Sequence, residues 1–338
     1  MEKKNVSIKD IAKLSGVSVA TVSRVINNDS GRFSEKTRKK VQAVIAETNY
    51  ETNTVAKSLR MKKSNTIGIL VPDISNSFFS ELVRKLEMQL FEEGYSTIIC
   101  NTNREKEKEK AYLTILESKM VDGLIVISGQ KEFIAGDLNR KIPIICIDRK
   151  PESTDDIAII HSDNYQGGVL ATEELLNSGC KRIALLTSQP MLSSSNHRRK
   201  GFIDTLKKHQ FPLENYTQIE VVADKLLSQT EMAKAEIRKR VKEGERFDGV
   251  FALNDRLAIG AIEATYTMEL EIPKDIRIVG FDNDPISRYC NPKLTTIKQN
   301  TDELSKRAST TLISLINGNV IEEKQQVIPI ELIRRGTT

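Results

Sequence analysis

The sequence contains no run of about 18 or more apolar residues, so it predicts no membrane-spanning helix. Its first residues, MEKKNVSIKD, have no apolar stretch of the kind that a secretory signal needs. The four cysteines stand singly, without a CxxC pair or clustering, which is typical of reduced, mostly buried thiols. Together these absences favour a soluble cytoplasmic protein with reduced thiols.

Motifs for catalysis and cofactor binding are also missing. No GxGxxG motif or P-loop lies between an expected strand and helix. Two of the three histidines, His197 and His209, share one segment that has no serine or cysteine nucleophile motif. We therefore expect no enzymatic activity, no cofactor and no metal. A periplasmic sugar receptor is an alternative that the missing signal peptide argues against.

Positive charge is concentrated at the beginning of the chain. Residues 1–63 hold 14 Lys and Arg against 6 Asp and Glu, whereas the rest of the 338 residues hold 37 and 40. The length itself favours about two or three domains. A basic module beside a nearly neutral body is the charge distribution expected of a protein that binds nucleic acid phosphates.

The segment KDIAKLSGVSVATVSRVIN, residues 9–27, predicts two short helices with a turn at Gly16. Ser7 and Asp10 have the spacing of a capping box at the first helix, and Ser18 caps the second. A third helix beginning near Ser34 closes a small core. Two helices joined by a glycine-containing turn, with a third packed against them, predict a helix-turn-helix domain.

The second helix has the composition of a helix that enters a DNA groove. It is nearly free of acids, and Arg24 is the candidate for bidentate contact with guanine. Val19 and Ala20 offer methyl contact, for instance to thymine. Taken singly, each is also compatible with an ordinary exposed helix position. The residues that we expect to contact DNA are Ser18, Val19, Ala20, Thr21, Ser23, Arg24 and Asn27.

From Thr66 onward, short β-branched runs alternate with helical stretches. Such alternation predicts parallel strands with helical crossovers, the doubly wound α/β design. The expected strands are too many for one small sheet, so we expect two lobes. The strands are TIGILVP, STIICN, DGLIVIS, IPIICID, IAIIH, RIALLTS, GVFALN, IRIVGFD and LTTIKQ.

Polar and aromatic residues follow these strands, where ligands bind in open α/β sheets. Aromatic faces, guanidinium groups, carboxylates and amides suit a sugar, because rings cover its C–H faces and charged hydrogen bonds fix its hydroxyls. Bland alternatives remain: one phenylalanine in the core, a structural Asp148–Arg149 ion pair, and a turn capped by Asp282. The candidate effector contacts are Asn76, Phe78, Phe79, Asp148, Arg149, Arg198, Asn254, Asp282 and Gln299.

Three segments carry a resemblance to the lactose-repressor family of bacterial regulators: SIKDIAKLSGVSVATVSRVIN, SEKTRKKVQAVIAETNY and NTVAKSLRMKKSNTIGILVPDISNSFF. The resemblance covers the whole chain. It implies that residues 53–60 form a hinge helix when two chains meet on DNA, with Leu59 as an apolar wedge in the minor groove. A plain basic linker is the alternative. The implied hinge contacts with DNA are Ala56, Lys57, Leu59 and Arg60.

The same resemblance implies a division of the chain. A helix-turn-helix DNA-binding domain would occupy residues 1–52, a hinge and linker residues 53–63, and an effector-binding and dimerisation domain residues 64–338. The last would be a two-lobe, periplasmic-binding-protein-like α/β domain. Its first lobe would span about 64–163 and 293–323, and its second about 164–292 and 324–338, with crossings near Pro292 and Lys324.

The cleft candidates also resemble those of bacterial ribose-binding proteins and of the ribose repressors in the family. One departure is Lys225, where relatives often have an aromatic residue. We therefore expect a repressor of sugar utilisation genes, with ribose as the candidate effector, released from a palindromic operator. A purine, a sugar phosphate or a protein acting as corepressor is the alternative.

Specific DNA binding requires two heads, because one small module makes too few contacts, so a homodimer is expected. The chain ends in IELIRRGTT without a leucine heptad, which favours a dimer over a tetramer.

Overall fold

The computed structural model describes residues 6–27, 33–50, 63–128, 138, 140–149, 157–189, 191–222 and 228–338. The chain divides into two compact units, Met1–Ser64 and Asn65–Thr338. Within the described residues no helix combines the length and the apolar character needed to cross a membrane.

The first unit is a three-helix domain made of α1 (Ile8–Ser15), α2 (Val19–Ile26) and α3 (Glu35–Thr48). Ser7 and Asp10 form the predicted capping box of α1. Gly16 follows with φ 63°, a left-handed conformation that glycine adopts without strain and that turns the chain into α2. The predicted helix-turn-helix is confirmed.

A small apolar core holds the three helices together. Ile11 from α1, Val22 and Val25 from α2, and Val41 from α3 are almost completely buried. The buried stripe of α1 also includes Ala12 and Ser15. Leu14, another apolar residue of α1, is 60% exposed, so it is not part of the buried face.

The second unit contains two six-stranded sheets, which define its two lobes. The first sheet has the order β11-β5-β4-β3-β1-β2, and all of its pairs are parallel. Its strands are β1 (Thr66–Val71), β2 (Ser96–Asn101), β3 (Gly123–Ile127), β4 (Ile144–Ile147), β5 (Ala158–Ser162) and β11 (Gln325–Ile328). Helices α5 (Ser77–Glu92) and α12 (Thr301–Ile316) pack on one face, and α6 (Lys106–Ser118) packs on the other.

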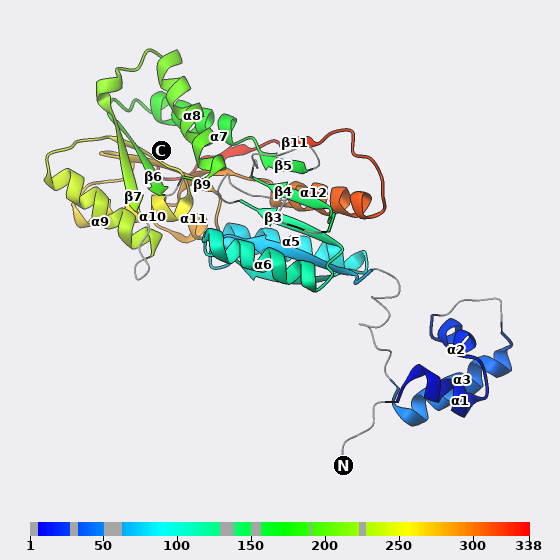
Figure 1. Cartoon of the computed structure of the whole chain (residues 1–338). Coiled ribbons are helices and arrows are strands. Elements are labelled where there is room, and N and C mark those ends of the chain that lie inside the picture. Colours follow the sequence, from blue (N-terminus) through cyan, green and yellow to red (C-terminus); the bar gives the residue numbers. More distant parts are fainter. Residues whose placement is uncertain are drawn as a thin grey trace. The chain divides into compact units, whose positions relative to one another are not determined.

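The second sheet has the order β12-β10-β9-β8-β6-β7, and its only antiparallel pair is β10–β12. Its strands are β6 (Ile183–Gln189), β7 (Tyr216–Val222), β8 (Gly249–Ala252), β9 (Arg277–Asp282), β10 (Thr295–Lys298) and β12 (Glu331–Ile333). Helices α7 (Asn164–Asn177) and α8 (Ser193–Lys208) cover one face, and α9 (Gln229–Lys242) and α10 (Asp255–Thr267) cover the other. A short helix, α11 (Ile286–Tyr289), and a 3-10 turn, Leu213–Asn215, complete this lobe (Figure 1).

The chain passes between the lobes at places that differ from the prediction. Strand β10 pairs with β9 in the second sheet, and β11 pairs with β5 in the first. The later crossings therefore lie between Lys298 and Thr301 and between Ile328 and Glu331. The crossings expected near Pro292 and Lys324 are therefore wrong, because β10 still belongs to the second sheet and β11 to the first.

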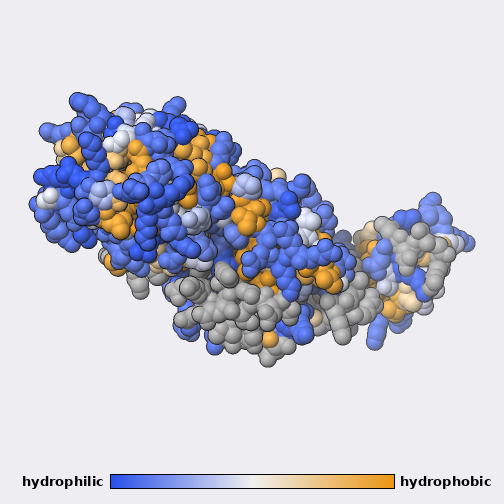
Figure 2. Space-filling model, turned by 90° about the horizontal axis from the view of Figure 1, so that it is seen from above, coloured by the Kyte–Doolittle hydropathy of each residue, from blue (hydrophilic) through white to orange (hydrophobic). Residues whose placement is uncertain are grey.

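Hydrophilic residues cover most of the face seen in Figure 2, and apolar residues appear there in separate patches. Large apolar side chains that stay exposed include Phe91 (70%) on α5 and Tyr289 (81%) on α11.

Candidate functional site

Helix α2 presents the side chains that the sequence assigned to DNA. Its apolar face, Val22 and Val25, is buried, while Val19 and Ala20 at its start are exposed. The Ser18 hydroxyl accepts a hydrogen bond from the Thr21 amide at 3.2 Å and so caps the helix. The helix carries no acid, so its N-terminal end keeps the positive partial charge that favours a phosphate.

The other residues assigned to this helix lie at its side and end. Thr21, Ser23 and Arg24 are half-buried, and the Asn27 side-chain amide donates to the Ser23 carbonyl at 2.8 Å. Ala56, Lys57, Leu59 and Arg60 lie outside the described residues, as does Lys225.

In the second unit, Arg198 is the centre of a buried polar network. Helix α8 carries it, and only 6% of the residue is exposed. Its Nε donates to Asn164 Oδ1 at 2.8 Å, and its NH1 group donates to the Leu253 carbonyl at 2.6 Å. The same NH1 lies 3.5 Å from Asp282 Oδ1, and the guanidinium lies 3.5 Å above the centre of the Phe281 ring. The charge is thus held between carboxylates and an aromatic face.

Asp148 lies across from Arg198 at the end of β4. Its backbone is left-handed, with φ 50°, and its Oδ1 accepts hydrogen bonds from the Ser162 amide and the Asn164 side chain, both at 3.0 Å. Burial raises the pKa of Asp148, whereas the Arg198 charge and the Ser162 amide act to lower it. The Asn164 side chain acts in the same direction as Arg198 and Ser162, so several groups of the chain stabilise the ionised form.

Gln299 connects Asp282 with the end of β5. Its side-chain amide donates to Asp282 Oδ1 at 2.7 Å, and its carbonyl accepts from the Ser162 hydroxyl at 2.6 Å. Burial raises the pKa of Asp282 to about 7, against the opposing effects of Arg198 and Gln299. Gln299 lies on the crossing between β10 and α12, so this bridge runs from one lobe to the other.

The structure therefore brings four predicted residues into one network: Asp148, Arg198, Asp282 and Gln299. Two others cap helices nearby. Asn76 Oδ1 accepts from the Phe78 amide at 3.0 Å at the start of α5, and Asn254 Oδ1 accepts from the Leu257 amide at 2.8 Å at the start of α10.

The two predicted aromatic residues lie in the core of the first lobe. Phe78 and Phe79 are each 7% exposed, and their rings meet edge to face with centroids 5.3 Å apart. The core role that was expected for one of them applies to both.

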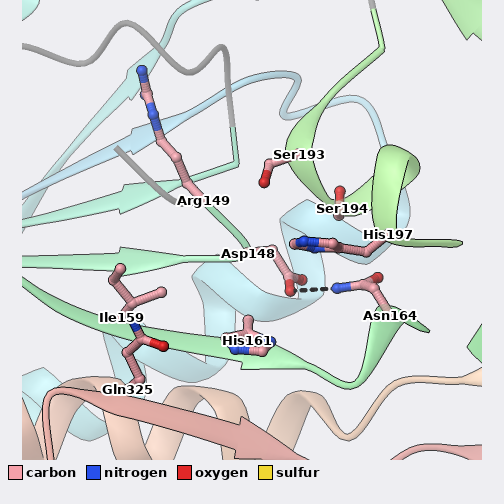
Figure 3. Close-up of a pocket in the computed structure, with 9 residues that line it drawn as sticks. All are labelled: Asp148, Arg149, Ile159, His161, Asn164, Ser193, Ser194, His197 and Gln325. Carbon is pink, nitrogen blue, oxygen red and sulfur yellow. Dashed lines mark hydrogen bonds between the residues drawn. The ribbon is translucent and has the colours of Figure 1, made fainter. Parts of the chain in front are cut away.

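Arg149 forms an ion pair with Glu109 and not with Asp148, the partner that the sequence suggested. Its two terminal nitrogens donate to the two carboxylate oxygens of Glu109 at 2.8 and 3.0 Å, and Arg149 is 2% exposed. Figure 3 shows its side chain directed away from the Asp148 carboxylate. The Asp148–Arg149 pair is thus replaced by a bidentate Arg149–Glu109 pair within the first lobe.

A pocket of about 340 Å³, counted to its open mouth, lies beside this network (Figure 3). Asp148 and Asn164 form one side of it, and the start of α8 forms another. The prediction missed Ser162 and Asn164, although both follow the expected strand IAIIH and obey the same strand-end rule. The lining residues are Asp148, Arg149, Ile159, His161, Asn164, Ser193, Ser194, His197 and Gln325.

Fold and site together define a class of protein: a helix-turn-helix domain joined to a two-lobe unit with a polar cleft network. A family profile described as "Bacterial regulatory proteins, lacI family" matches residues 7–53, and a second, "Periplasmic binding protein-like domain", matches residues 172–338. The predicted fold class is confirmed.

Similar proteins extend the match over the whole chain. The chain is 37% identical over 335 residues to the ribose operon repressor of Halalkalibacterium halodurans, and the match covers 98% of this chain and 97% of that repressor. It is 34% identical over 342 residues to the sucrose operon repressor of Pediococcus pentosaceus, covering 98% of each. The lac repressor dimer bound to operator and the anti-inducer ONPF has a TM-score of 0.86 at 28% identity, covering 99% of each chain.

The chain belongs to the lacI family of bacterial regulatory proteins. It is accordingly a DNA-binding transcription regulator and not an enzyme, as the sequence predicted.

Proposed function

We propose that this regulator is a homodimeric repressor that leaves a palindromic operator when a sugar binds between its lobes, with a pentose such as ribose as the candidate. The observation that carries the proposal is the network of Asp148, Arg198, Asp282 and Gln299. It joins the carboxyl ends of strands from both sheets around one buried guanidinium. The similarity to ribose and sucrose operon repressors supports a sugar as the effector class.

The chemistry of this network suits a polyol. Ionised Asp148 and Asp282 are acceptors for sugar hydroxyls, whereas Arg198 donates to ring or hydroxyl oxygens. Charge-assisted hydrogen bonds are strong in a site shielded from water, and several of them fix the orientation of a small, multiply hydroxylated ligand. A purine would offer few hydrogen-bond donors to the two buried carboxylates, Asp148 and Asp282.

Sugar binding would change the affinity for DNA by changing the arrangement of the two lobes. Gln299 is on a crossing segment and bonds residues at the strand ends of both lobes, so a sugar that contacts Asp282 or Ser162 acts on the lobe connection itself. Such an effector shifts the equilibrium only by the difference in its affinity for the two arrangements. We assign the higher sugar affinity to the arrangement that binds DNA weakly.

The DNA-binding part of the proposal rests on α2 and on dimerisation. One α2 presents Val19, Ala20 and Arg24 to a few base pairs, so two copies related by a twofold axis are needed for a specific site. The complex of the repressor with its operator is proposed to form in the cytoplasm.

Fluorescence anisotropy of a labelled operator, found by binding-site selection with the full chain, tests the proposal. We expect one member of a panel of pentoses, hexoses and disaccharides to release the operator. Asp282→Asn should abolish release, because the neutral asparagine side chain lacks the charged carboxylate that accepts hydrogen bonds from the sugar hydroxyls. Asp204→Asn, on the outer part of α8, is the matched control and should respond normally. An absence of release by every sugar, phosphorylated or not, would rule out the proposed effector class.

A further inference from the structure

Asp255 is a buried carboxyl group of the second lobe that the proposed sugar contacts leave without a role. It is the first residue of α10, and only 1% of it is exposed. Its Oδ2 accepts a hydrogen bond from the Asp284 amide at 2.7 Å, and its Oδ1 accepts one from the Thr296 hydroxyl at 2.6 Å. The side chain therefore connects the start of α10 with β10 and with the segment that follows β9.

The segment that follows β9 has a backbone that needs such support. Asp282 has φ 114° and Asn283 has φ 55°, and residues with a Cβ rarely adopt positive φ values. The Asn283 amide donates to the Thr296 hydroxyl oxygen at 3.3 Å, while the Asp284 amide donates to Asp255 itself. Asp255 thus fixes two consecutive amides, one directly and one through Thr296. An unfavourable backbone conformation persists only where surrounding contacts hold it.

The two acids of this segment make contacts in different directions. Asp282 accepts a hydrogen bond from the Gln299 side chain at 2.7 Å and belongs to the proposed sugar contacts. Asp284 accepts from the Ser77 hydroxyl of the first lobe and, through Oδ1, from the Ile286 amide at 3.1 Å. One proposed sugar contact and one contact between the lobes therefore depend on the conformation of the same short segment.

The Asp255 carboxyl group is also closely packed. A Cβ at Gly280 of β9 would lie 2.2 Å from Asp255 Oδ1 and 2.9 Å from the Leu294 side chain, so the strand approaches the carboxyl group more closely than a side chain there would allow. Burial, followed by the charge of Asp282, raises the pKa of Asp255 well above its usual value. Both effects favour the neutral acid, whose shape is close to that of asparagine.

We propose that Asp255 is a positioning residue that couples sugar recognition to a contact between the lobes. Through the Asp284 amide and the Thr296 hydroxyl it fixes the segment after β9. That segment directs the Asp282 carboxylate to the sugar and the Asp284 carboxylate to the first lobe, so Asp255 acts through its neighbours and not by touching the sugar. The inference rests on the proposed function for its sugar, whereas the anchoring of the segment can be measured without a ligand.

Three variants test the anchoring. Asp255→Ala removes both acceptors. Asp255→Asn is the conservative variant: its side-chain oxygen accepts from the Asp284 amide, and its NH2 group donates to the Thr296 hydroxyl, which can accept as well as donate. Thr296→Val removes the hydroxyl that connects Asp255 with the Asn283 amide and keeps the shape of the side chain.

Two matched controls leave these contacts in place. Ile262→Ala lies on the same helix, α10, and weakens the core of the second lobe, in which Ile262 is 3% exposed. Thr187→Val removes a buried hydroxyl from β6 of the same sheet, one that donates to the Ile219 carbonyl. Far-UV circular dichroism verifies that each variant folds, and a thermal melt measures how far each is destabilised.

Hydrogen–deuterium exchange of the ligand-free full chain measures the anchoring. We expect the amides of residues 283 and 284 to exchange at least about tenfold faster in Asp255→Ala than in the parent protein, because their hydrogen bonds are lost or weakened. Asp255→Asn should stay close to the parent protein, and Thr296→Val should affect residue 283 most. Both controls should leave this segment unchanged.

Operator release by the panel of pentoses, hexoses and disaccharides measures the consequence for function. The sugar concentration needed for half-maximal release should rise at least about tenfold in Asp255→Ala and less in Thr296→Val. Asp255→Asn should respond like the parent protein. Ile262→Ala should also respond normally although its melting temperature is lower, a result that separates positioning from general loss of stability.

The outcomes decide the two proposals separately. An unchanged sugar response in Asp255→Ala would overturn the positioning role, and so would equal losses in Asp255→Ala, Asp255→Asn and Ile262→Ala. If Asp255→Ala does not fold, Thr296→Val takes its place, and a response equal to that of Thr187→Val overturns the proposal. If no sugar releases the operator from the parent protein, the proposed function fails and the sugar coupling with it, while the exchange rates still show whether Asp255 anchors the segment.

Discussion

Replacing Arg198 by methionine tests whether one guanidinium neutralises the carboxylates of the cleft. Methionine keeps much of the side-chain volume but removes the charge and the donors. Asp282, whose Oδ1 lies 3.5 Å from the guanidinium, and Asp148 would then be buried without their common cation. The Leu253 carbonyl would lose the donor that lies 2.6 Å from it.

The size of the effect follows from these contacts. Removing one partner of a buried ion pair costs about 3–5 kcal/mol, and a carbonyl left without a donor contributes about 1–3 kcal/mol within that range. The loss depends on pH. Asp282 already has its pKa raised to about 7, and without Arg198, which acts to lower it, that pKa rises further. At pH 6 the carboxyl is protonated in the variant and needs no cation, whereas at pH 8 it is charged or must take up a proton.

The free energy of unfolding of Arg198→Met should therefore fall most at pH 8 and least at pH 6. Urea titrations followed by far-UV circular dichroism measure it, because the chain has no tryptophan for fluorescence. Arg199→Met, which removes a more exposed arginine that bonds Gln218, is the control and should show a small, pH-independent change. Adding Asp282→Asn to Arg198→Met should restore part of the stability at pH 8. Equal destabilisation at both pH values would refute the electrostatic explanation.

Three further predictions concern DNA recognition, pH and helix packing. Arg24→Ala should cost about 1–3 kcal/mol at one base pair and relax the preference there, and an unchanged base preference in binding-site selection would contradict this. Sugar affinity should fall as the pH drops from 8 to 6, because Asp282, with a pKa of about 7, loses the charge that accepts from hydroxyls. The stability of the ligand-free protein should change in the opposite direction and fall as the pH rises from about 4 to 7. Over that range Asp282 has released its proton in the unfolded chain but still holds it in the folded chain, so raising the pH favours unfolding. Calorimetry and urea titrations against pH measure the two trends, and Asp282→Asn should remove both. Gly201→Ala should lower the free energy of unfolding by about 1–3 kcal/mol, because the new Cβ would lie 2.1 Å from the Tyr165 carbonyl and push α8 away from α7. The effector response should also weaken, because α8 carries Arg198. A thermal melt equal to that of the parent protein would contradict this prediction.

The strand-end rule located most of the buried network from the sequence alone. Asp148, Arg198, Asp282 and Gln299 come from distant parts of the chain, and each follows a strand or its adjoining loop. The rule works because parallel strands of one sheet end at the same edge. It does not tell which side chains turn toward the cleft: Phe78 follows β1 closely, yet it packs in the core.

The sequence was less informative about three of the four edge strands. The second half of β7, YTQIEVV, alternates between buried and exposed positions, and β11 and β12 have only four and three residues. Edge strands bury one face at most, so they lack the continuous apolar run that marks β3 or β4. Only their pairing partners in the folded chain, β6, β5 and β10, show that they belong to the sheets.

Direct contacts between the lobes lie next to the proposed effector site. The Ser77 hydroxyl of the first lobe donates to Asp284 of the second, and Arg256 donates to the Ser75 carbonyl. The Arg256 guanidinium also lies 3.6 Å from the Asp73 carboxylate. These contacts involve immediate neighbours of the proposed effector contacts, since Ser77 follows Asn76 and Asp284 is two residues beyond Asp282.

These three contacts are partly exposed, so each of them contributes little to holding the lobes together. A ligand whose hydrogen bonds differ in free energy between two lobe arrangements by a few kcal/mol changes the populations of those arrangements. The crossing that carries Gln299 also connects the lobes, because its side chain bonds Ser162 in one lobe and Asp282 in the other. The residues proposed to recognise the effector are thus adjacent in the chain to residues that make contacts between the lobes, so the proposed binding requires no separate pathway to reach these contacts.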